Sequence, residues 1–229
     1  MDRQVQNSGI YPVPFSSRQV TAVYSGREFP LAKRNAFLQA LDIFPAQLQL
    51  VRQVHGAEII IADPEGLIEP TPEGDGLIIG SSGVAIGILT ADCIPVFFWD
   101  ALQGVGGLAH AGWRGLKAGI IPKMIQTLRS EFETKPSTLQ IAFGPAIRKC
   151  CYEVGEEFKD IFPPYYQHAA TGKAHVDLLA IALDEAAAAG VPRAQVFDSG
   201  VCTACASSPF FSARRDKSPE RILSVLQIR

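Results

Sequence analysis

The sequence predicts one α+β domain in which mixed β-sheets are flanked by helices. Its 229 residues suit one large domain, and a hydrophobic content of 47% supplies a sizeable core. Apolar runs with the length of buried strands follow one another directly, at residues 84–90, 96–99 and 105–109. Strands that follow strands argue against regular strand–helix alternation. No repeat or change of composition divides the chain, so we expect residues 1–229 to form one domain, with 1–19 as a peripheral N-terminal segment.

In the first half of the chain, short apolar or alternating segments predict strands, and one segment with an apolar face predicts a helix. The alternating segment 47–54 runs into His55, and Gly56 allows the bend that follows. Pro95 cannot donate a ladder hydrogen bond, which puts nearby Cys93 at a strand end or a bulge. The expected strands are residues 20–24, 47–54, 58–62, 77–79, 84–90, 96–99 and 105–109, and the expected helix is 30–41.

The second half combines longer helices with a few strands. Pro122 fits the first turn of a helix that runs to Phe132. Asp177 is a suitable cap for a helix over residues 176–189, which Gly190 ends. The remaining segments predict strands at 139–143, 196–197 and 222–228, a short helix at 154–162 and a loop at 163–174.

Charge and composition exclude several classes of protein. The net charge is −2 and no basic block is present, which argues against a nucleic-acid partner. The longest apolar segment, residues 84–99, is interrupted by Asp92 and Pro95 and is too short to span a bilayer. The first ten residues lack the apolar stretch of a secretory signal. We therefore expect a cytoplasmic protein without a membrane partner, whose five cysteines are reduced.

Three chemically active side chains end or interrupt apolar runs. Cys93 breaks one run, His110 ends the next, and His55 ends an earlier one. Catalytic zinc sites use three nitrogen, sulfur or oxygen ligands and leave a fourth position open, and two histidines with one cysteine fit that description. The same residues also fit a metal-free site with Cys93 as nucleophile, His110 as base and Asp92 nearby to orient groups. Each residue alone also has a purely structural interpretation, as a small core thiol or a buried imidazole.

Arginine and glycine residues suggest where an anion could bind. Residues 112–115, Gly-Trp-Arg-Gly, precede a helix expected to start near Gly119, and Arg114 offers a bidentate donor for phosphate. The same residues could serve only a turn and an ion pair. Arg52 is a weaker phosphate candidate, since it also reads as a surface strand residue.

Two cysteine pairs and an aromatic segment remain. Cys202 and Cys205 form a CxxC motif, but the adjacent Cys150 and Cys151 look like poor partners for a zinc site, so we expect a structural role for the motif. Residues 210–216, Phe-Phe-Ser-Ala-Arg-Arg-Asp, could stack a base and bind phosphate through Arg214, or could be core aromatics with surface charge.

Taken together, the motifs resemble the YfiH/YlmD-like laccase-domain family, whose members are also catalogued as multicopper polyphenol oxidases or purine nucleoside phosphorylases. The resemblance covers roughly residues 47–229. It is carried by QVHG at 53–56, TADC at 90–93, AHAGWRG at 109–115, FGPAI at 143–147, CYEVG at 151–155, and CTAC with FFSARRD at 202–216. The region before residue 47 is compact and lacks a longer Asn-Leu-containing loop common in relatives.

The resemblance implies an α/β/β/α layered fold related to cysteine-hydrolase toxins, with His55, Cys93 and His110 as metal ligands. Zinc is the metal it implies. The implied reaction is phosphorolysis of adenosine, inosine or methylthioadenosine to a base and ribose 1-phosphate, with adenosine deamination alongside. Copper is less favoured, because a multicopper oxidase needs about ten histidine ligands and the chain has four. The common zinc deaminase pattern, HxE followed by PCxxC, is also absent.

We therefore predict a zinc-dependent purine nucleoside phosphorylase with adenosine deaminase side activity. Its substrates would be a purine nucleoside and phosphate, the latter held by Arg114, Arg52 or Arg214. Two rivals remain open. One is a Cys93–His110 hydrolase that acts on an amide or a peptidoglycan precursor. The other is a non-enzymatic partner-binding protein. The oligomeric state does not follow from the sequence.

Overall fold

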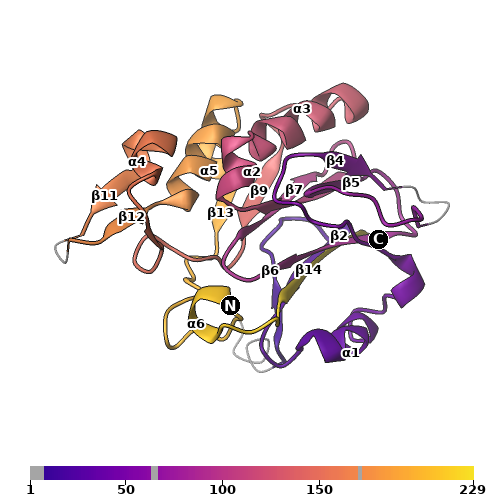
Figure 1. Ribbon diagram of the computed structural model, residues 1–229. Helices are drawn as coiled ribbons and strands as arrows, with labels where there is room; N and C mark the ends of the chain where they lie inside the picture. Colours follow the sequence, from indigo (N-terminus) through magenta and orange to yellow (C-terminus); the bar gives the residue numbers. More distant parts are fainter. Residues whose placement is uncertain (1–7, 63–66, 170–171) are drawn as a thin grey trace.

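The computed structural model describes residues 8–62, 67–169 and 172–229, arranged in layers (Figure 1). Two β-sheets pack face to face, with three helices outside one sheet and a short helix outside the other. This is the α/β/β/α arrangement that the resemblance implied. Residues 1–7 of the expected peripheral segment lie outside the described residues, whereas residues 10–12 form an edge strand.

The two large sheets both mix parallel and antiparallel neighbours, as the succession of strands predicted. In the five-stranded sheet the order is β1 (Ile10–Pro12), β2 (Val20–Ser25), β14 (Ile222–Ile228), β6 (Ala85–Thr90) and β3 (Leu48–Gln49). In the six-stranded sheet the order is β13 (Val196–Asp198), β9 (Gln140–Phe143), β7 (Ile94–Asp100), β8 (Val105–Ala111), β5 (Gly76–Ile79) and β4 (Ile59–Ile61). Parallel pairs occur at β3–β6, β4–β5 and β9–β13.

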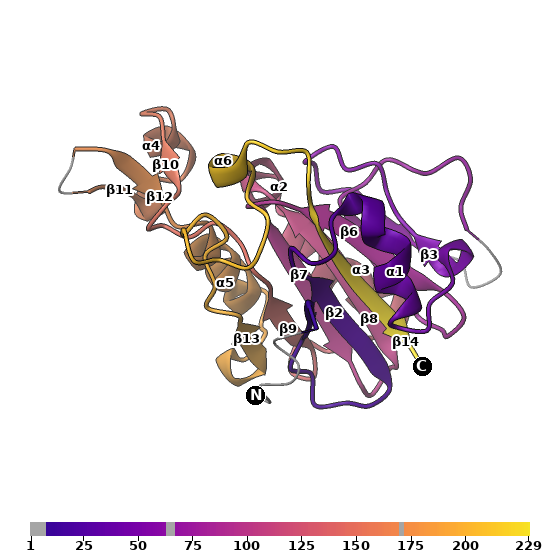
Figure 2. The same ribbon diagram turned by 90° about the horizontal axis from the view of Figure 1, so that it is seen from below.

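Alternation along the central strands fills two separate cores. On β7, Val96 and Phe98 face the helices α2 (Trp113–Lys117), α3 (Ile120–Phe132) and α5 (Leu178–Ala188), whereas Phe97 and Trp99 face the other sheet. Successive strand residues point to opposite faces, so a strand buried on both sides is apolar throughout. A third core lies between the five-stranded sheet and α1 (Arg34–Gln39), which Figure 2 shows outside β6 and β14.

Two of the connections that pass from one sheet to the other carry residues of the predicted His55–Cys93–His110 site. The chain leaves β6 at Thr90 and enters β7 at Ile94, so Cys93 lies in the crossing. It also leaves β3 and enters β4 through the loop that holds His55. The prediction that Cys93 lies at a strand end is confirmed, and the crossings bring residues distant in sequence to one rim of the sandwich.

A small third sheet corrects the expected loop at residues 163–174. It has the order β10 (Glu153–Val154), β12 (Ala174–Val176) and β11 (Tyr166–His168), and it lies with α4 (Phe158–Ile161) at one end of the molecule in Figures 1 and 2. The expected helix at 154–162 is therefore shorter, since Val154 pairs in this sheet and the helix begins only at Phe158. The expected loop is wrong because Tyr166–His168 pairs antiparallel with Ala174–Val176.

Other boundaries also differ from expectation. Of the alternating segment 47–54, only Leu48–Gln49 forms a strand, because the rest lacks a neighbour beyond an isolated bridge from Arg52 to Glu73. The helix expected at 30–41 divides into a 3-10 turn and α1. The helices at 122–132 and 176–189 are confirmed within two residues at each end, and Asp177 caps the latter by accepting from the backbone N–H of Ala180 at 3.0 Å.

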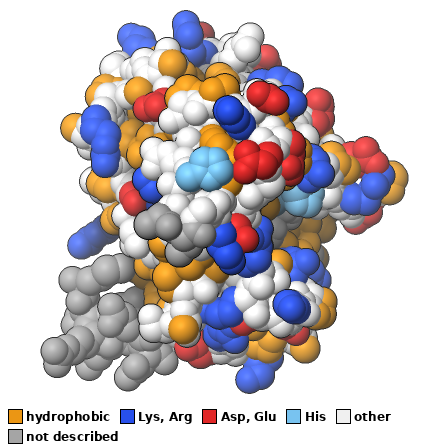
Figure 3. Space-filling view, turned by 60° about the vertical axis from the view of Figure 1, so that its left-hand side comes forward, with side chains coloured by type: hydrophobic (Ala, Val, Ile, Leu, Met, Phe, Trp, Pro, Cys, Tyr) orange, Lys and Arg blue, Asp and Glu red, His pale blue; other side chains and the backbone are white. Residues whose placement is uncertain are grey.

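The surface agrees with the balanced composition. On the face shown in Figure 3, basic and acidic side chains are interspersed. Among the described residues, no helix combines the length and apolar character needed to cross a membrane.

Candidate functional site

A pocket of about 370 Å³ opens at the rim where the two crossings meet. Its lining includes His55, Cys93 and His110, so the structure brings together the three residues singled out from the sequence. One ligand atom of each lies within 4.8 Å of the other two. The two imidazole rings meet edge to face, with centroids 4.7 Å apart.

Asp75, which the sequence reasoning did not select, organises this cluster from behind. Its carboxylate is fully buried and contacts Nδ1 of His110 at 2.7 Å. The backbone N–H of His110 also donates to the backbone carbonyl of Asp75 at 2.8 Å. These contacts leave Nε2 of His110 directed away from Asp75 and free to meet Cys93 or a metal. The sequence places the Asp75-Gly76 pair at the opening of a strand, and only the pairing of β5 with β8 reveals the role of Asp75.

The same carboxylate fixes the backbone of the His55 loop. Three successive N–H groups, from Val54, His55 and Gly56, donate to Asp75 at 3.2, 3.0 and 2.7 Å. His55 has a φ of 60°, a left-handed conformation that is uncommon for a residue other than glycine. Such strain persists where surrounding contacts over-determine it and clusters at functional sites. One buried side chain therefore positions both histidines.

Cys93 is held in a similar way by its neighbour. Asp92 has a φ of 90°, and its carboxylate accepts from the hydroxyl of Thr203 at 2.7 Å and from the backbone N–H of Arg214 at 2.8 Å. Its carbonyl accepts from Ile147 at 2.9 Å. Asp92 thus ties the crossing to the C-terminal loops and does not contact the imidazoles directly in the way a third catalytic residue would.

Gly112 leaves the space that the cluster needs. A Cβ atom there would lie 2.9 Å from Sγ of Cys93 and 3.4 Å from Cδ2 of His55. The first separation is below ordinary contact distance, so any side chain would displace the thiol. The sequence suggested this glycine for a turn, but it is also needed because only glycine leaves room for the thiol of Cys93.

The electrostatics favour a thiolate beside an imidazolium when no metal is present. Burial would raise the pKa of Cys93, but hydrogen bonds from His110 and His55 outweigh it and lower that pKa to about 6. Burial would lower the pKa of His110, but its hydrogen bonds to Asp75 and Cys93 raise it to about 9. A metal cation in place of the imidazolium proton would balance the same negative charge on the Cys93 thiolate.

The donor set fits zinc and does not fit a multicopper centre. Zinc ligands lie about 2.0–2.3 Å from the ion, so three donor atoms this close can reach one ion with small rotations. Asp75 supplies the carboxylate that commonly orients a metal-bound histidine. The other two histidines of the chain, His168 and His175, lie on β11 and β12 outside the pocket. Among the described residues, the pocket holds only two imidazoles.

The structure gives the phosphate candidates different surroundings. Arg114 is exposed and lies 4.2 Å over the ring of Trp113, on α2, which begins well before the expected helix start near Gly119. Arg214 lies 5.5 Å over the ring of Tyr152 and donates to the carbonyl of Glu153 at 2.9 Å. Burial, then the charge of Cys93, raises the pKa of Tyr152 to about 12. Both arginines thus carry their charge near Tyr152.

Arg52 lies outside the pocket, whereas Arg221, which the sequence did not single out, is part of its lining. Arg52 is exposed, forms an ion pair with Glu73 and is not part of the pocket lining. Arg221 lines the pocket and donates to the carbonyls of Ser218 and Glu220 at 3.1 and 2.8 Å. It precedes β14 directly, a position that has no local sequence signal for function.

The aromatic residues of the segment 210–216 are core residues, which was the structural one of the two alternatives. Phe210 and Phe211 are only 2% and 7% exposed and belong to the core between the two sheets. They cannot stack a base from that position. The residues that follow form α6 (Ala213–Asp216), with the hydroxyl of Ser212 as its cap.

This layered fold with a histidine and cysteine cluster at its rim defines a class of protein. The chain belongs to the multi-copper polyphenol oxidoreductase laccase family, whose model matches residues 8–229. The structure of Bacillus licheniformis YfiH superposes with a TM-score of 0.90 over 98% of each chain at 22% identity, which shows the shared fold.

The curated relatives that carry functional names include a phosphorylase and a deaminase. The purine nucleoside phosphorylase YlmD of Geobacillus stearothermophilus is 34% identical over 180 residues, 72% of this chain and 66% of that protein. Its solved structure has a TM-score of 0.85 and covers 93% of both chains. The adenosine deaminase RL5, from an unknown prokaryotic organism, is 34% identical over 183 residues, 73% of this chain and 70% of that protein.

Proposed function

We propose that this protein is a zinc-dependent purine nucleoside phosphorylase with adenosine deaminase side activity. The observation that carries the proposal is the convergence of His55, Cys93 and His110 on one point of a pocket, with Asp75 behind His110. The names of the relatives support the reaction class. Adenosine, inosine and methylthioadenosine are the proposed nucleosides.

His55, Cys93 and His110 would hold the zinc. The bound ion would supply a Lewis acid and lower the pKa of a water molecule beside it. Asp75 keeps the Nδ1 proton of His110 in place, so that Nε2 serves as the ligand.

Cationic side chains around the pocket would bind and orient the second substrate. Arg114 and Arg214 carry charge near Tyr152, and Arg221 lines the pocket itself. In phosphorolysis an oxygen of phosphate forms the bond to the ribose carbon as the bond to the base breaks. Guanidinium groups match the geometry of phosphate and hold its charge during that displacement. Arg52 is a poor choice because it is paired outside the pocket.

The direct test incubates the purified protein with inosine and phosphate and measures hypoxanthine and ribose 1-phosphate. We expect both products in equal amounts and no ribose 1-phosphate when phosphate is omitted. Cys93→Ala and His55→Ala should abolish turnover, while His168→Ala, which removes an exposed histidine on β11, should not. Undiminished turnover in Cys93→Ala would contradict the proposal. Ammonia release from adenosine tests the side activity separately.

A second candidate function is a metal-independent Cys–His hydrolase. It is favoured by the lowered pKa of Cys93, the raised pKa of His110 and the contact of His110 with Asp75. The thiolate would attack an amide carbonyl, His110 would protonate the departing amine, and water would then release the acyl group from sulfur. A peptidoglycan precursor is one amide of this kind.

Metal removal and thiol alkylation separate the two functions. Chelation should abolish a zinc-dependent phosphorylase and leave a thiol hydrolase active. In zinc-free protein the alkylation rate of Cys93 should rise as the pH rises through about 6, because the thiolate is the reactive form. Added zinc should protect Cys93 if it is a ligand. Rapid alkylation of the zinc-loaded protein would favour the hydrolase.

A further inference from the structure

Four of the five cysteines meet at a second place, which we call the cysteine cluster: Cys150, Cys151, Cys202 and Cys205. Their Sγ atoms all lie within 4.8 Å of one another, and all four thiols are free. The Sγ–Sγ separation is 3.7 Å for Cys150–Cys151, 3.9 Å for Cys150–Cys205 and 3.7 Å for Cys151–Cys205. None of these residues lines the pocket of Cys93.

The fold builds this cluster from the segments that follow two neighbouring strands. Strands β9 and β13 are parallel neighbours, and beyond them a bridge joins Ala146 to Cys202. The backbone N–H of Thr203 donates to the carbonyl of Ala146 at 3.0 Å. On the other segment, the N–H of Cys151 donates to the carbonyl of Arg148 at 2.8 Å, which closes a turn.

That turn corrects the expectation that adjacent cysteines make poor partners. The turn directs the side chains of Cys150 and Cys151 to the same side, so their sulfur atoms come as close as those of residues far apart in the sequence. The sequence could not reveal this, because the spacing between the two pairs depends on the pairing of β9 with β13.

We propose that the cysteine cluster binds one Zn²⁺ ion as a tetrahedral tetrathiolate, distinct from the His55–Cys93–His110 site. A Zn–S bond of about 2.3 Å gives a tetrahedron with sulfur–sulfur edges of about 3.8 Å. The three separations given above lie within 0.1 Å of that edge. Tetrahedral sulfur ligation is typical of zinc or iron, and a site with four protein ligands leaves no position for water, so its role is structural.

The surroundings of the cluster stabilise negative charge. Four thiolates around one divalent ion carry a net charge of −2, and binding releases the thiol protons to solvent. The backbone N–H of Arg148 donates to Sγ of Cys202 at 3.4 Å. The guanidinium of Arg215 donates to the carbonyl of Cys205 at 2.5 Å, which places a cation beside the site. Hydrogen bonds and charges of this kind orient metal ligands and tune their affinity.

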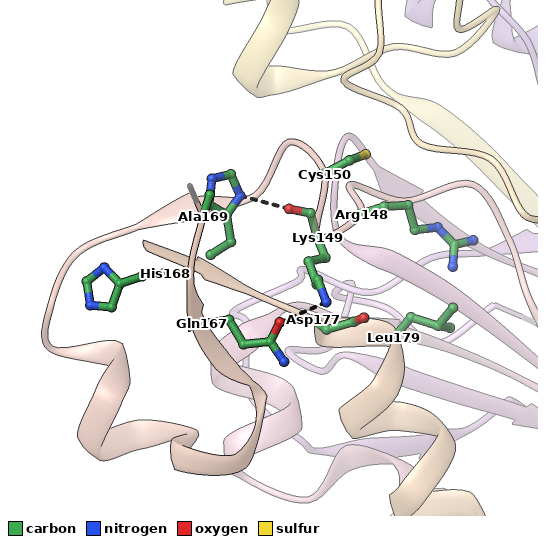
Figure 4. Close-up of a pocket in the computed structure, with 9 residues that line it drawn as sticks. Arg148, Lys149, Cys150, Gln167, His168, Ala169, Asp177 and Leu179 are labelled. Carbon is green, nitrogen blue, oxygen red and sulfur yellow. Dashed lines mark hydrogen bonds between the residues drawn. The ribbon is translucent and has the colours of Figure 1, made fainter. Parts of the chain in front are cut away.

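Cys150 gives the cluster an access route. It is exposed and borders a neighbouring pocket, shown in Figure 4 together with Arg148 and Lys149. Lys149 is held against the opposite wall by a hydrogen bond from Nζ to Gln167 at 2.9 Å. An ion or a chelator can therefore reach one ligand without unfolding of the core.

A bound ion would fix a wall of the active pocket. Thr203 lies between Cys202 and Cys205, and its hydroxyl donates to Asp92 at 2.7 Å, next to Cys93. The loop that holds the CxxC motif also leads to α6, whose Ala213 lines the pocket. The cluster joins this loop to the segment after β9, so the ion would act as a cross-link behind the site.

The test measures metal content in the double variant His55→Ala/Cys93→Ala, whose cysteine cluster is intact. We expect one zinc per chain in this variant and two in the wild type. Adding Cys150→Ser and Cys205→Ser to the double variant should reduce zinc to none. With cobalt in place of zinc, the double variant should show the charge-transfer and visible bands of a tetrahedral tetrathiolate.

Three results would overturn the proposal. Absence of bound metal in the double variant after purification with added zinc would show that the cluster is not a metal site. Iron in preference to zinc would refute the zinc assignment. Disulfides among these four cysteines, in protein whose free thiols are blocked at cell lysis, would show that the cluster is a redox site. Because the double variant keeps all four thiols, none of these results depends on whether the serine variants fold.

Discussion

The buried carboxylate of Asp75 lies 2.7 Å from Nδ1 of His110 and receives three backbone N–H bonds from the loop of His55. Burial alone would raise the pKa of Asp75, but the hydrogen bonds from His110 and from this loop lower it. The carboxylate is therefore charged at neutral pH. It connects His55 and His110, which lie far apart in the sequence.

Asp75→Asn should weaken zinc binding and activity by about 10- to 100-fold, a size typical of losing a carboxylate behind a metal-bound histidine. The asparagine amide accepts through one oxygen only, so it cannot accept from His110 and from all three N–H groups of the His55 loop. A competition titration with a chelator gives the affinity, and inosine phosphorolysis gives kcat/KM. Asp100→Asn is the matched control, because Asp100 is also fully buried but lies at the far end of β7. An equal loss of affinity in both variants would refute a specific role for Asp75.

Gly112→Ala should lower zinc affinity while the protein stays folded. The added methyl group would stand 2.9 Å from Sγ of Cys93, so the thiol must turn away. We expect a loss of at least about tenfold, equivalent to roughly 1.4 kcal/mol of binding free energy. Ala118→Ser, at the exposed end of α2, adds one heavy atom without touching the site. Unchanged affinity in Gly112→Ala would show that the thiol is not a ligand in its present position.

Thr203→Val should destabilise the pocket wall and reduce activity without removing any ligand. It removes the hydroxyl donor from one oxygen of Asp92, and a hydrogen bond to a charged group contributes about 1.5–3 kcal/mol. Thermal unfolding reports the stability, and kcat/KM reports the position of Cys93. Thr138→Val is the matched control, since it removes a hydroxyl contact to Asp100 of 3.2 Å. A fall in kcat/KM of the same size in the control would argue against a link between Thr203 and the site.

Glu185→Gln should stabilise the protein at alkaline pH and not at acid pH. Burial raises the pKa of Glu185 to about 7, and its Oε2 has no hydrogen-bond partner among the described residues. The folded state then binds a proton more tightly than the unfolded chain, so stability falls as the pH rises from the ordinary pKa of the group to about 7. We expect a gain of about 1–2 kcal/mol near pH 8, allowing for partial exposure.

Urea unfolding of wild type and variant near pH 8 and near pH 4 checks this prediction. At the lower pH the glutamic acid is mostly protonated in both states, so the two proteins should be nearly equal in stability. Glu131→Gln, an exposed position on α3, should show no gain at either pH. A gain for Glu185→Gln that is independent of pH would contradict the assigned cause.

The strands and the three central residues could be predicted because their signals are local. Continuous apolar runs mark strands buried on both faces, and a polar residue that interrupts such a run marks a rim. Cys93 and His110 could be selected from the sequence by this signal. Asp75 was not, because its role comes from the antiparallel pairing of β5 with β8 and from a loop 20 residues earlier.

The cysteine cluster and the place of Arg221 in the pocket could not be predicted from the sequence, for the same reason. Cys150 and Cys205 meet only after β9 and β13 have paired, and no spacing in the sequence encodes that distance. Arg221 reaches the pocket because β14 starts beside the end of β6, where Ile222 pairs with Thr90. Pairings between distant segments therefore decided which chemically active side chains share a site.

The position of β14 has a consequence for synthesis. It lies between β2 and β6, so these two early strands have no direct hydrogen bonds to each other. While the ribosome is still making residues 91–221, β2 and β6 each keep an unpaired edge where β14 will later lie. Such edges invite pairing with other chains. We therefore expect this half of the sandwich to close only after residues 222–228 emerge, and chaperones to be most needed in that interval.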